Sequence, residues 1–311
     1  MNVTLVDANA VGYNSNSAKR LSTSEDKPVQ AIFHSIKFMW NLSTKFKQHT
    51  PLVLWDAHCQ WRYDLYPEYK SKREEYEKQR IAREEYREQR PAIKEFFKTM
   101  GFRQLESRGY EADDIAGVYA NKISAMPDSS AILVTGDKDW FQLVSENVSI
   151  FYMHKGEIID LSNFKAKTGY DTTRQFIVAK AMHGDSSDTI TGVGGIGEGT
   201  ALKLMNIYGS MRNVIEIYKT KGEFTKENIH SDLSRVRNKV NSFCKNELGQ
   251  WGILNRNLKL MDLSKIEPPK VGFYREHYEP DIDSFVELCL EYEFFSLADK
   301  AERIFNEIAR K

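Results

Sequence analysis

The stretch AILVTGDKD at residues 131–139 sets the architecture of this chain. It begins as a short run of aliphatic and β-branched residues, which is typical of a buried strand, and it ends in two acidic side chains, Asp137 and Asp139. Asp is depleted in strands, so the strand is expected to stop where these acids begin. Two more strands of the sequence end in the same way.

These further segments, VTLVD at 3–7 and PLVLWD at 51–56, are short apolar runs that also end in Asp. Helical patterns, including those at 29–47 and 92–100, separate the strands along the chain. Strands that alternate with helices predict an α/β fold with a parallel sheet, and such sheets bind ligands at the carboxyl ends of their strands. We therefore expect the acids that end these strands to meet at one edge of the sheet.

The sequence GYEADDIAGVYA at 109–120 places three carboxylates, Glu111, Asp113 and Asp114, just before an apolar helical repeat. One acid at a helix N-terminus is stabilised by the helix dipole by roughly 0.3–1 kcal/mol, whereas three acids repel one another. A plain acidic helix start and a ligand-binding cluster are both open explanations for this stretch alone. The helix should run antiparallel to the strands, which brings its N-terminus to the edge where the other acids lie.

The segment HGDSSDTITG at 183–192 adds two more acids, and the full set numbers nine. The nine candidate metal ligands are Asp7, Asp56, Glu111, Asp113, Asp114, Asp137, Asp139, Asp185 and Asp188. A turn or cap role explains any single Asp, but it does not explain three strands that each end in one. Carboxylates crowd together away from water only with cations, and oxygen ligands without His or Cys suit Mg²⁺ or Mn²⁺. Two such ions about 3.5–4 Å apart are common machinery for phosphodiester cleavage.

The composition is that of a globular protein: 311 residues, 41% hydrophobic and 28% charged, with no apolar run of the ~18 residues that a membrane helix needs. MNVTLVDANAVGY at the start reads as a strand and not as a signal peptide, and three widely spaced cysteines indicate a reducing cytoplasm, of a bacterium or of a virus's host. The net charge of zero argues at first against a nucleic-acid partner. With the nine acids set aside, however, the rest of the chain carries an excess of nine positive charges, enough to hold a phosphate backbone.

Taken together, these motifs resemble the flap endonuclease / 5′→3′ exonuclease family, especially its bacterial and bacteriophage members. The matching stretches are LVDANA (5–10), PEYKSKR (67–73), EADDIAG (111–117), VTGDKDWFQLV (134–144) and GDSSDTITGVGGIGEGTALKL (184–204), and the likeness extends over roughly residues 1–260. The resemblance implies a PIN-like parallel-sheet nuclease core at 1–180 with a helical arch at about 61–95. It also implies a C-terminal helical region at 181–311 with a helix-three-turn-helix DNA-binding motif at about 184–210.

The resemblance also implies roles for the acids. Four of them match the group nearest the first metal: Asp7, Asp56, Glu111 and Asp113. Five match the group that serves the second: Asp114, Asp137, Asp139, Asp185 and Asp188. The implied cofactor is Mg²⁺, as two or more ions, with Mn²⁺ able to replace it.

Three residues at the base of the implied arch match functional positions of the family. Lys70 matches the lysine that contacts the scissile phosphate, and Arg73 matches a supporting arginine. Tyr69 matches a position where an aromatic ring stacks on a base, although core packing of this ring is an equal alternative. The following sequence to residue 90 has almost no apolar stripe and many alternating charges, so an exposed surface helix is the alternative to an arch that single-stranded DNA passes beneath.

GVGGIG at 192–197 satisfies the GxGxxG dinucleotide pattern, but the polar, turn-rich sequence before it is not a strand, which excludes that interpretation. A tight turn between two helices fits better, and the family grips duplex DNA with this turn, often with a K⁺ ion on backbone carbonyls. The implied DNA-binding residues are Gly192, Gly194, Gly195, Gly197, Thr200 and Lys203, in addition to Tyr69. Two departures are Gly199, where many members carry a cation, and Thr189, where many carry Asn.

The sequence thus predicts a metal-dependent, structure-specific 5′ nuclease of replication or repair, with 5′→3′ exonuclease and flap endonuclease action. Its substrates are DNA with single-strand/duplex junctions and free 5′ ends, and RNA–DNA hybrids where RNA primers are removed. We expect a monomer with no membrane partner that works beside replication proteins. A PIN-type endoribonuclease, whose chains are usually shorter and lack the helix-three-turn-helix, and a non-catalytic branched-DNA-binding paralogue, which is expected to have lost acids, are the alternatives.

Overall fold

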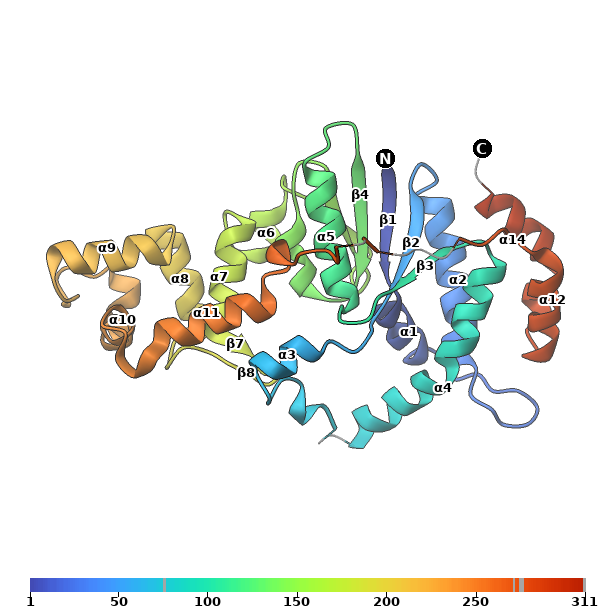
Figure 1. The fold of residues 1–311 in the computed structure, drawn as a ribbon, viewed down its shortest axis with the longest axis horizontal. Helices are drawn as coiled ribbons and strands as arrows, with labels where there is room; N and C mark the ends of the chain where they lie inside the picture. The colour runs from blue at the N-terminus through green and yellow to red at the C-terminus, as the bar shows by residue number, and fades with distance from the viewer. Residues whose placement is uncertain (75–76, 271, 274–276, 310–311) are drawn as a thin grey trace.

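The computed structural model describes residues 1–311 except 75–76, 271, 274–276 and 310–311, and it describes only the backbone of residues 73, 74 and 79. At its centre is a six-stranded sheet in the order β3-β2-β1-β4-β5-β6, in which only β6 runs antiparallel to its neighbour. The strands are β1 (Asn2–Asp7), β2 (Thr50–Trp55), β3 (Arg103–Glu106), β4 (Ser130–Thr135), β5 (Val148–Tyr152) and β6 (Glu157–Ile159). The predicted α/β fold with a parallel sheet is confirmed (Figure 1).

Helices cover both faces of the sheet, because alternate strand residues point to opposite sides. Leu5 and Leu133 belong to the core on the side of α5, while Val6 and Val134 belong to the core on the side of α2 and α4. The helices around the sheet are α1 (Ala8–Asn16), α2 (Gln30–Lys45), α4 (Glu77–Thr99), α5 (Ala112–Ser124) and α6 (Phe164–Thr168). Burial on both faces explains why the strands read as nearly continuous apolar runs.

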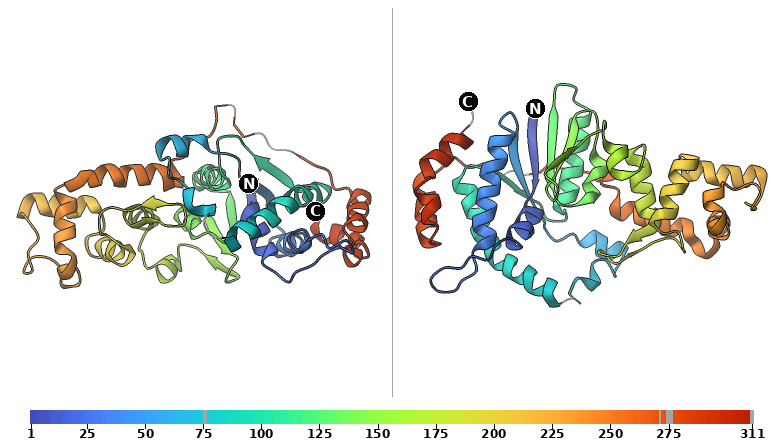
Figure 2. Two further views of the ribbon diagram at one scale, coloured as in Figure 1. Left: turned by 90° about the horizontal axis from the view of Figure 1, so that it is seen from below. Right: turned by 180° about the vertical axis from the view of Figure 1, so that it is seen from behind.

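A helical region extends from one side of the sheet (Figure 2). It consists of α7 (Thr173–His183), the hairpin β7 (Gly184–Asp185) with β8 (Ile190–Thr191), α8 (Glu198–Tyr208), α9 (Met211–Lys221), η3 (Ser231–Val236), α10 (Arg237–Cys244), η4 (Glu247–Gly249) and α11 (Gln250–Met261). Two helices joined by a short hairpin and a glycine turn agree with the predicted helix-three-turn-helix. The predicted domain boundary between residues 180 and 181 falls inside α7.

The segment from α3 (Gln60–Leu65) through η1 (Ser71–Glu74) into α4 curves out from the carboxyl-end edge of the sheet (Figure 1). From Ala82 onward, α4 is fastened to α1: the Tyr86 ring fills the space above Gly12, and its hydroxyl donates to the Asn9 side chain at 2.9 Å. Asn16 donates to the Ala82 carbonyl at 3.0 Å. The sequence-based expectation that this helix has almost no anchors therefore holds only before residue 82.

The last helices, α12 (Ile282–Glu291), α13 (Phe295–Ala298) and α14 (Ala301–Ile308), pack on the far side of α2 and α4. The rings of Phe285 and Phe96 meet edge-on with centroids 5.7 Å apart, and Trp40 donates to Glu307 at 2.7 Å. This packing supports the root of α4. Within the described parts of the chain, no helix is both long enough and apolar enough to span a membrane.

Candidate active site

The carboxyl ends of the parallel strands open into a cavity of about 750 Å³. Seven of the nine predicted acids line it: Asp7, Asp56, Asp113, Asp137, Asp139, Asp185 and Asp188. Three lysines, Lys70, Lys138 and Lys180, line the same cavity. The prediction that acids at the strand ends meet at one edge of the sheet is confirmed for Asp7, Asp56, Asp137 and Asp139, and the other three acids join them there.

Hydrogen bonds to the backbone fix the acids that end β1 and β2. Asp7 accepts from the backbone N–H of Ala10 at 2.9 Å and from the hydroxyl of Thr135 at 2.9 Å. Asp56 accepts from the N–H of Ala112 at 2.7 Å, in the first turn of α5. Each of these carboxylates therefore caps a helix while it faces the cavity.

The remaining acids of the cavity come from a helix start and two turns. Asp113, in the first turn of α5, accepts from the indole N–H of Trp140 at 2.6 Å. Asp137 is the N-cap of η2 (Lys138–Leu143) and accepts from the N–H of Asp139 at 2.8 Å. Asp185 accepts from the N–H of Ser187 at 2.8 Å. Local capping and turn chemistry thus hold these side chains at the edge of the sheet.

Crowding changes the protonation of the carboxylates. Burial, and then the neighbouring charge of Asp56, raises the pKa of Asp7 to about 7. Burial and Asp137 raise the pKa of Asp139 to about 7, although Lys180 opposes the rise. Burial and neighbouring acids also raise the pKa of Asp56 and of Asp113. At neutral pH this group of carboxylates stays fully ionised only if cations neutralise it.

The donor set fits hard divalent cations, because the lining side chains include seven carboxylates. Among the described residues, no three His, Cys, Asp or Glu side chains surround a common point as one ion requires. The fit therefore rests on the chemistry and charge of the cavity. Which acids bind each ion, directly or through water, stays a prediction.

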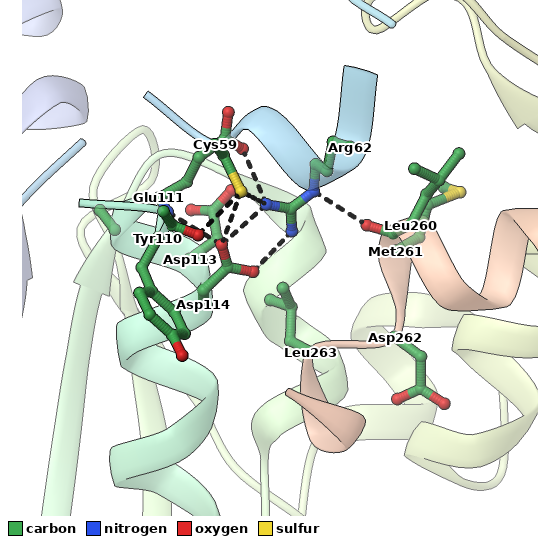
Figure 3. A network of polar contacts seen from close by, with 12 residues as sticks. Cys59, Arg62, Tyr110, Glu111, Asp113, Asp114, Leu260, Met261, Asp262 and Leu263 are labelled. Carbon is green, nitrogen blue, oxygen red and sulfur yellow. Dashed lines mark hydrogen bonds and ion pairs between the residues drawn. The ribbon is translucent and has the colours of Figure 1, made fainter. Parts of the chain in front are cut away.

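Two predicted metal ligands, Asp114 and Glu111, do not line the cavity. Asp114 is fully buried and pairs through both oxygens with the guanidinium of Arg62, at 2.6 and 2.7 Å (Figure 3). With both oxygens engaged by Arg62, Asp114 faces away from the cavity, and its predicted metal role stays a prediction that this geometry does not support. Glu111 lies between the cavity and the buried pair of Arg62 and Asp114, and Lys70 donates to its Oε1 at 2.6 Å. Its role as a metal ligand stays a prediction.

The predictions for the three residues at the root of the arch fare differently. Lys70 lies at the cavity wall, as its predicted contact with a scissile phosphate requires, and its backbone N–H donates to the Asp188 carbonyl at 2.9 Å. Tyr69 is only 4% exposed and donates to Glu111 at 3.0 Å, so its ring is unavailable to a base and the core-packing alternative is correct. The backbone of Arg73 belongs to η1, but its side chain lies outside the described part of the structure.

The glycines at 192–197 have different roles. A Cβ on Gly192 would lie 2.4 Å from the His183 carbonyl, so this glycine is required by backbone packing and not by a ligand. Gly195 has a φ of +77°, which favours glycine, and the Lys239 side chain lies against it. A Cβ on Gly197, which precedes α8, would meet no described atom within 4 Å outside the adjoining backbone. The turn is therefore open where Gly197 leads into the helix, and this is the position where a phosphate could approach closely.

The other predicted DNA-binding positions lie in or beside the turn. Gly194 faces the Gln250 side chain, and the N–H of Thr200 in α8 donates to the Gly197 carbonyl at 3.0 Å. Lys203 is one turn further along α8, where its ammonium donates to the Asp232 carbonyl at 3.5 Å. These positions are consistent with a phosphate-binding turn, and their contacts with DNA stay predictions.

Sequence reasoning missed three cations of this region. Lys180 donates to Asp139 and, at 2.9 Å, to Asp185, and so lies between two acids of the cavity. Arg62 neutralises Asp114, and Lys239 covers Gly195 from α10. The only signal for Lys180 is its place five residues before Asp185 on a helix that leads to the cavity. The local sequence around Arg62 and Lys239 does not predict their contacts with Asp114 and Gly195.

Comparison with solved structures places this geometry in a class. The fold matches that of the T5 D15 protein co-crystallised with metal ions, with a TM-score of 0.64 and 23% identity over 100% of both chains. It also matches the catalytic core of Rad2 in complex with DNA substrate, with a TM-score of 0.60 and 14% identity over 100% of this chain and 92% of that one. These similarities define the class by fold, as an α/β core with a parallel sheet.

Sequence comparisons identify the family. The family model for the 5′-3′ exonuclease N-terminal resolvase-like domain matches residues 2–169, and the model for the 5′-3′ exonuclease C-terminal SAM fold matches residues 172–244. The chain belongs to the 5′-3′ exonuclease family.

Individual relatives agree with this assignment. A 5′-3′ exonuclease of Aquifex aeolicus is 26% identical over 296 residues, which cover 94% of this chain and 91% of the relative. A thermostable DNA polymerase I of Thermus thermophilus is 34% identical over 242 residues, which cover 76% of this chain. The chain matches only 28% of the length of that polymerase. The similarity is therefore to one part of the polymerase.

Proposed function

We propose that this protein hydrolyses phosphodiester bonds in DNA that has single-strand/duplex junctions and free 5′ ends, as a 5′→3′ exonuclease and flap endonuclease that uses Mg²⁺. The observation that carries the proposal is the cavity in which seven carboxylates and Lys70 meet beneath the arch segment. Mg²⁺ bound there would activate water and stabilise the leaving oxygen, and Mn²⁺ would replace it. Membership of the 5′-3′ exonuclease family supports this reading of the cavity.

The residues of the chain divide the work. The strand-end acids, among them Asp7 and Asp56, would hold the ions. Burial and neighbouring negative charges raise the pKa values of these two carboxyls, and a bound cation would offset those charges. Lys70 binds the scissile phosphate from the cavity wall and stabilises the charge that develops on it. The open turn at Gly197 and the cation of Lys239 receive a phosphate of the duplex, and a K⁺ ion on the carbonyls of this turn would strengthen the contact.

The wider biological role follows from the same substrate class. A nuclease for 5′ flaps serves DNA replication or repair, where RNA–DNA hybrids at primers are further substrates and replication proteins are its neighbours. We expect it to act as a monomer in the cytoplasm. These features rest on the family and on the predicted chemistry.

One set of reactions tests the proposal. Labelled flap, nicked, gapped and RNA-primed duplexes, together with a single-stranded RNA, are incubated with the protein in Mg²⁺ and the products are sized. We expect cleavage near the junction of the flap and release of 5′ products from the nick and gap. Cleavage of the single-stranded RNA alone would support the endoribonuclease alternative, and binding without cleavage of any substrate would support the non-catalytic paralogue.

Two variants assign the cleavage to the cavity. Asp137→Asn and Asp139→Asn each remove one carboxylate that lines it, and we expect either change nearly to abolish cleavage in Mg²⁺. Affinity for flap DNA in EDTA should survive, because Lys and Arg contacts with phosphates dominate binding. Normal turnover by either variant would contradict the metal assignment.

A further inference from the structure

The buried guanidinium of Arg62 connects the wall of the cavity to the protein interior. Its side chain is 3% exposed, and it donates to both oxygens of Asp114 at 2.6 and 2.7 Å (Figure 3). Its Nε donates to the Leu260 carbonyl at 3.3 Å, and one Nη also donates to the Cys59 sulfur at 3.2 Å. Partners on every edge of the guanidinium plane leave it a single orientation.

Glu111 lies between Arg62 and Lys70, which lines the cavity. Its Oε2 is 3.5 Å from Arg62 Nη1 and accepts from the Tyr69 hydroxyl at 3.0 Å, while its Oε1 accepts from Lys70 at 2.6 Å. Its backbone N–H donates to Asp114 at 2.8 Å. The four charged groups therefore alternate in sign from Lys70 through Glu111 and Arg62 to Asp114.

This arrangement decides the charge of Glu111. Burial raises the pKa of its carboxyl, but the charges of Lys70 and Arg62, together with hydrogen bonds from Lys70 and Tyr69, outweigh burial and hold the pKa below its ordinary value. Arg62 cannot give up its proton, because burial, which lowers its pKa, is outweighed by Asp114 and Glu111. The hydrogen bonds from Tyr69 and Lys70 thus make Glu111 a fixed acceptor for Lys70.

We propose that Arg62, anchored by Asp114, is a positioning residue for Lys70: it holds the Glu111 side chain in place, and Glu111 holds the Lys70 ammonium at the cavity wall. The inference rests on the proposed function, in which Lys70 binds the scissile phosphate. It gives Asp114 a role in catalysis without a metal ion. The competing explanation is that the pair of Arg62 and Asp114 only stabilises the fold.

The variant that tests this idea must keep the fold. Arg62→Met alone would leave Asp114 buried and charged without its partner, which is strongly destabilising, whereas a buried pair removed as a whole is tolerated far better. We therefore choose the double variant Arg62→Met/Asp114→Asn, in which an amide oxygen still accepts from the Glu111 N–H. The matched control is Arg174→Met/Asp262→Asn, because Asp262 is also buried and accepts from Arg174 at 2.6 Å, but neither residue lines the cavity.

The first readout is single-turnover cleavage of flap DNA at saturating protein. We expect the double variant to lose roughly 10- to 100-fold in rate, the usual cost when a residue that orients a functional group is removed. Affinity for the flap in EDTA should not change. In a Lys70→Ala background the double variant should cause no further loss, because its effect passes through Lys70. A wild-type rate, or an equal loss with and without Lys70, would overturn the proposal.

The second readout needs no activity. Brief acetylation with an amine reagent, followed by mass spectrometry, compares Lys70, whose side chain is 12% exposed, with the exposed Lys72 as internal standard. In the double variant the labelling of Lys70 relative to Lys72 should rise severalfold, and in the control variant it should not. An unchanged ratio overturns the inference. Failure of the wild-type protein to cut any substrate would instead overturn the proposed function and leave this measurement to decide the positioning role.

Discussion

Replacing Lys180 by Met tests whether its ammonium neutralises the cavity when metal is absent. The side chain of Lys180 is 16% exposed and pairs with Asp139 and Asp185. Burial lowers the pKa of Lys180, but the two acids outweigh burial and raise it, so the group stays charged. Lys180→Met would leave both carboxylates without this partner.

The size of the effect follows from the burial of the pair. Removing one partner of a buried ion pair costs about 3–5 kcal/mol of unfolding free energy. An unfolding entropy of about 2.1 cal/mol/K per residue gives roughly 0.65 kcal/mol/K for 311 residues. The melting temperature in EDTA should therefore fall by about 5–8 °C, measured at pH 8, where the raised pKa of Asp139, about 7, still leaves it mostly ionised.

Metal should reverse this loss. Because Lys180 repels divalent ions from Asp139 and Asp185, its removal should move the Mn²⁺ titration midpoint, followed by calorimetry, to lower concentration. Mn²⁺ should also raise the melting temperature of the variant more than that of the wild type. The matched control is Lys138→Met, because Lys138 is exposed and lines the same cavity. If Lys180→Met has the melting temperature of the wild type in EDTA and binds Mn²⁺ with unchanged affinity, the ammonium of Lys180 is not the counter-ion of Asp139 and Asp185.

Four more predictions test the rest of the site. Lys70→Ala should lower the single-turnover rate of flap cleavage by roughly 10²–10³, the usual loss for one electrostatic donor, and an equal loss in Lys72→Ala would instead indicate general electrostatics. Gly197→Val adds a side chain in open space, so mobility shifts should show weaker binding of duplex-containing DNA while short single strands are cut normally; equal losses would mean misfolding. The pKa of Asp7, about 7 against 3.8, favours its protonated form in the folded protein, so the contribution of Asp7 to metal-free stability should be full below about pH 4 and be lost as the pH rises through about 7. Mg²⁺ should then raise the melting temperature more at pH 8 than at pH 5, and a pH-independent rise refutes this assignment. Hydrogen exchange at 77–81 should be fast in the free protein and slow with flap DNA bound. A bulky block attached to the 5′ end before the protein is added should suppress cleavage. An undiminished cleavage rate of the blocked flap would rule out threading of the 5′ end beneath the arch.

The parallel sheet and the meeting of its acids could be predicted from sequence, because the topology of a parallel sheet alone brings the ends of its strands together. The direction of individual side chains on α5 could not. Asp113 and Asp114 are neighbours in sequence but lie about 100° apart around a helix, so that one faces the cavity and the other faces Arg62. Which of the two faces the cavity depends on packing against α3 and α11, which no local pattern records.

The arch shows the same limit. Its charged sequence does not reveal the buried contacts of α4, among them Tyr86, whose ring packs over Gly12. Tyr69 was ambiguous for the opposite reason, because an aromatic ring next to a functional lysine serves equally well in a core or on a base. Its burial and the hydrogen bond from its hydroxyl to Glu111 distinguish the two.

The backbone bond from Lys70 to the Asp188 carbonyl ties the root of the arch to the loop that carries two acids of the cavity, and the N–H of Lys72 adds a second tie to the Thr189 hydroxyl at 3.4 Å. A strand that orders the arch must therefore also settle the position of Asp188. Linked equilibria are reciprocal, so whatever factor a 5′ strand contributes to the affinity for metal, metal returns to the affinity for the strand. If the protein cuts DNA as proposed, we expect the loss of either one to weaken the binding of the other, so that release of product and release of ions are coupled.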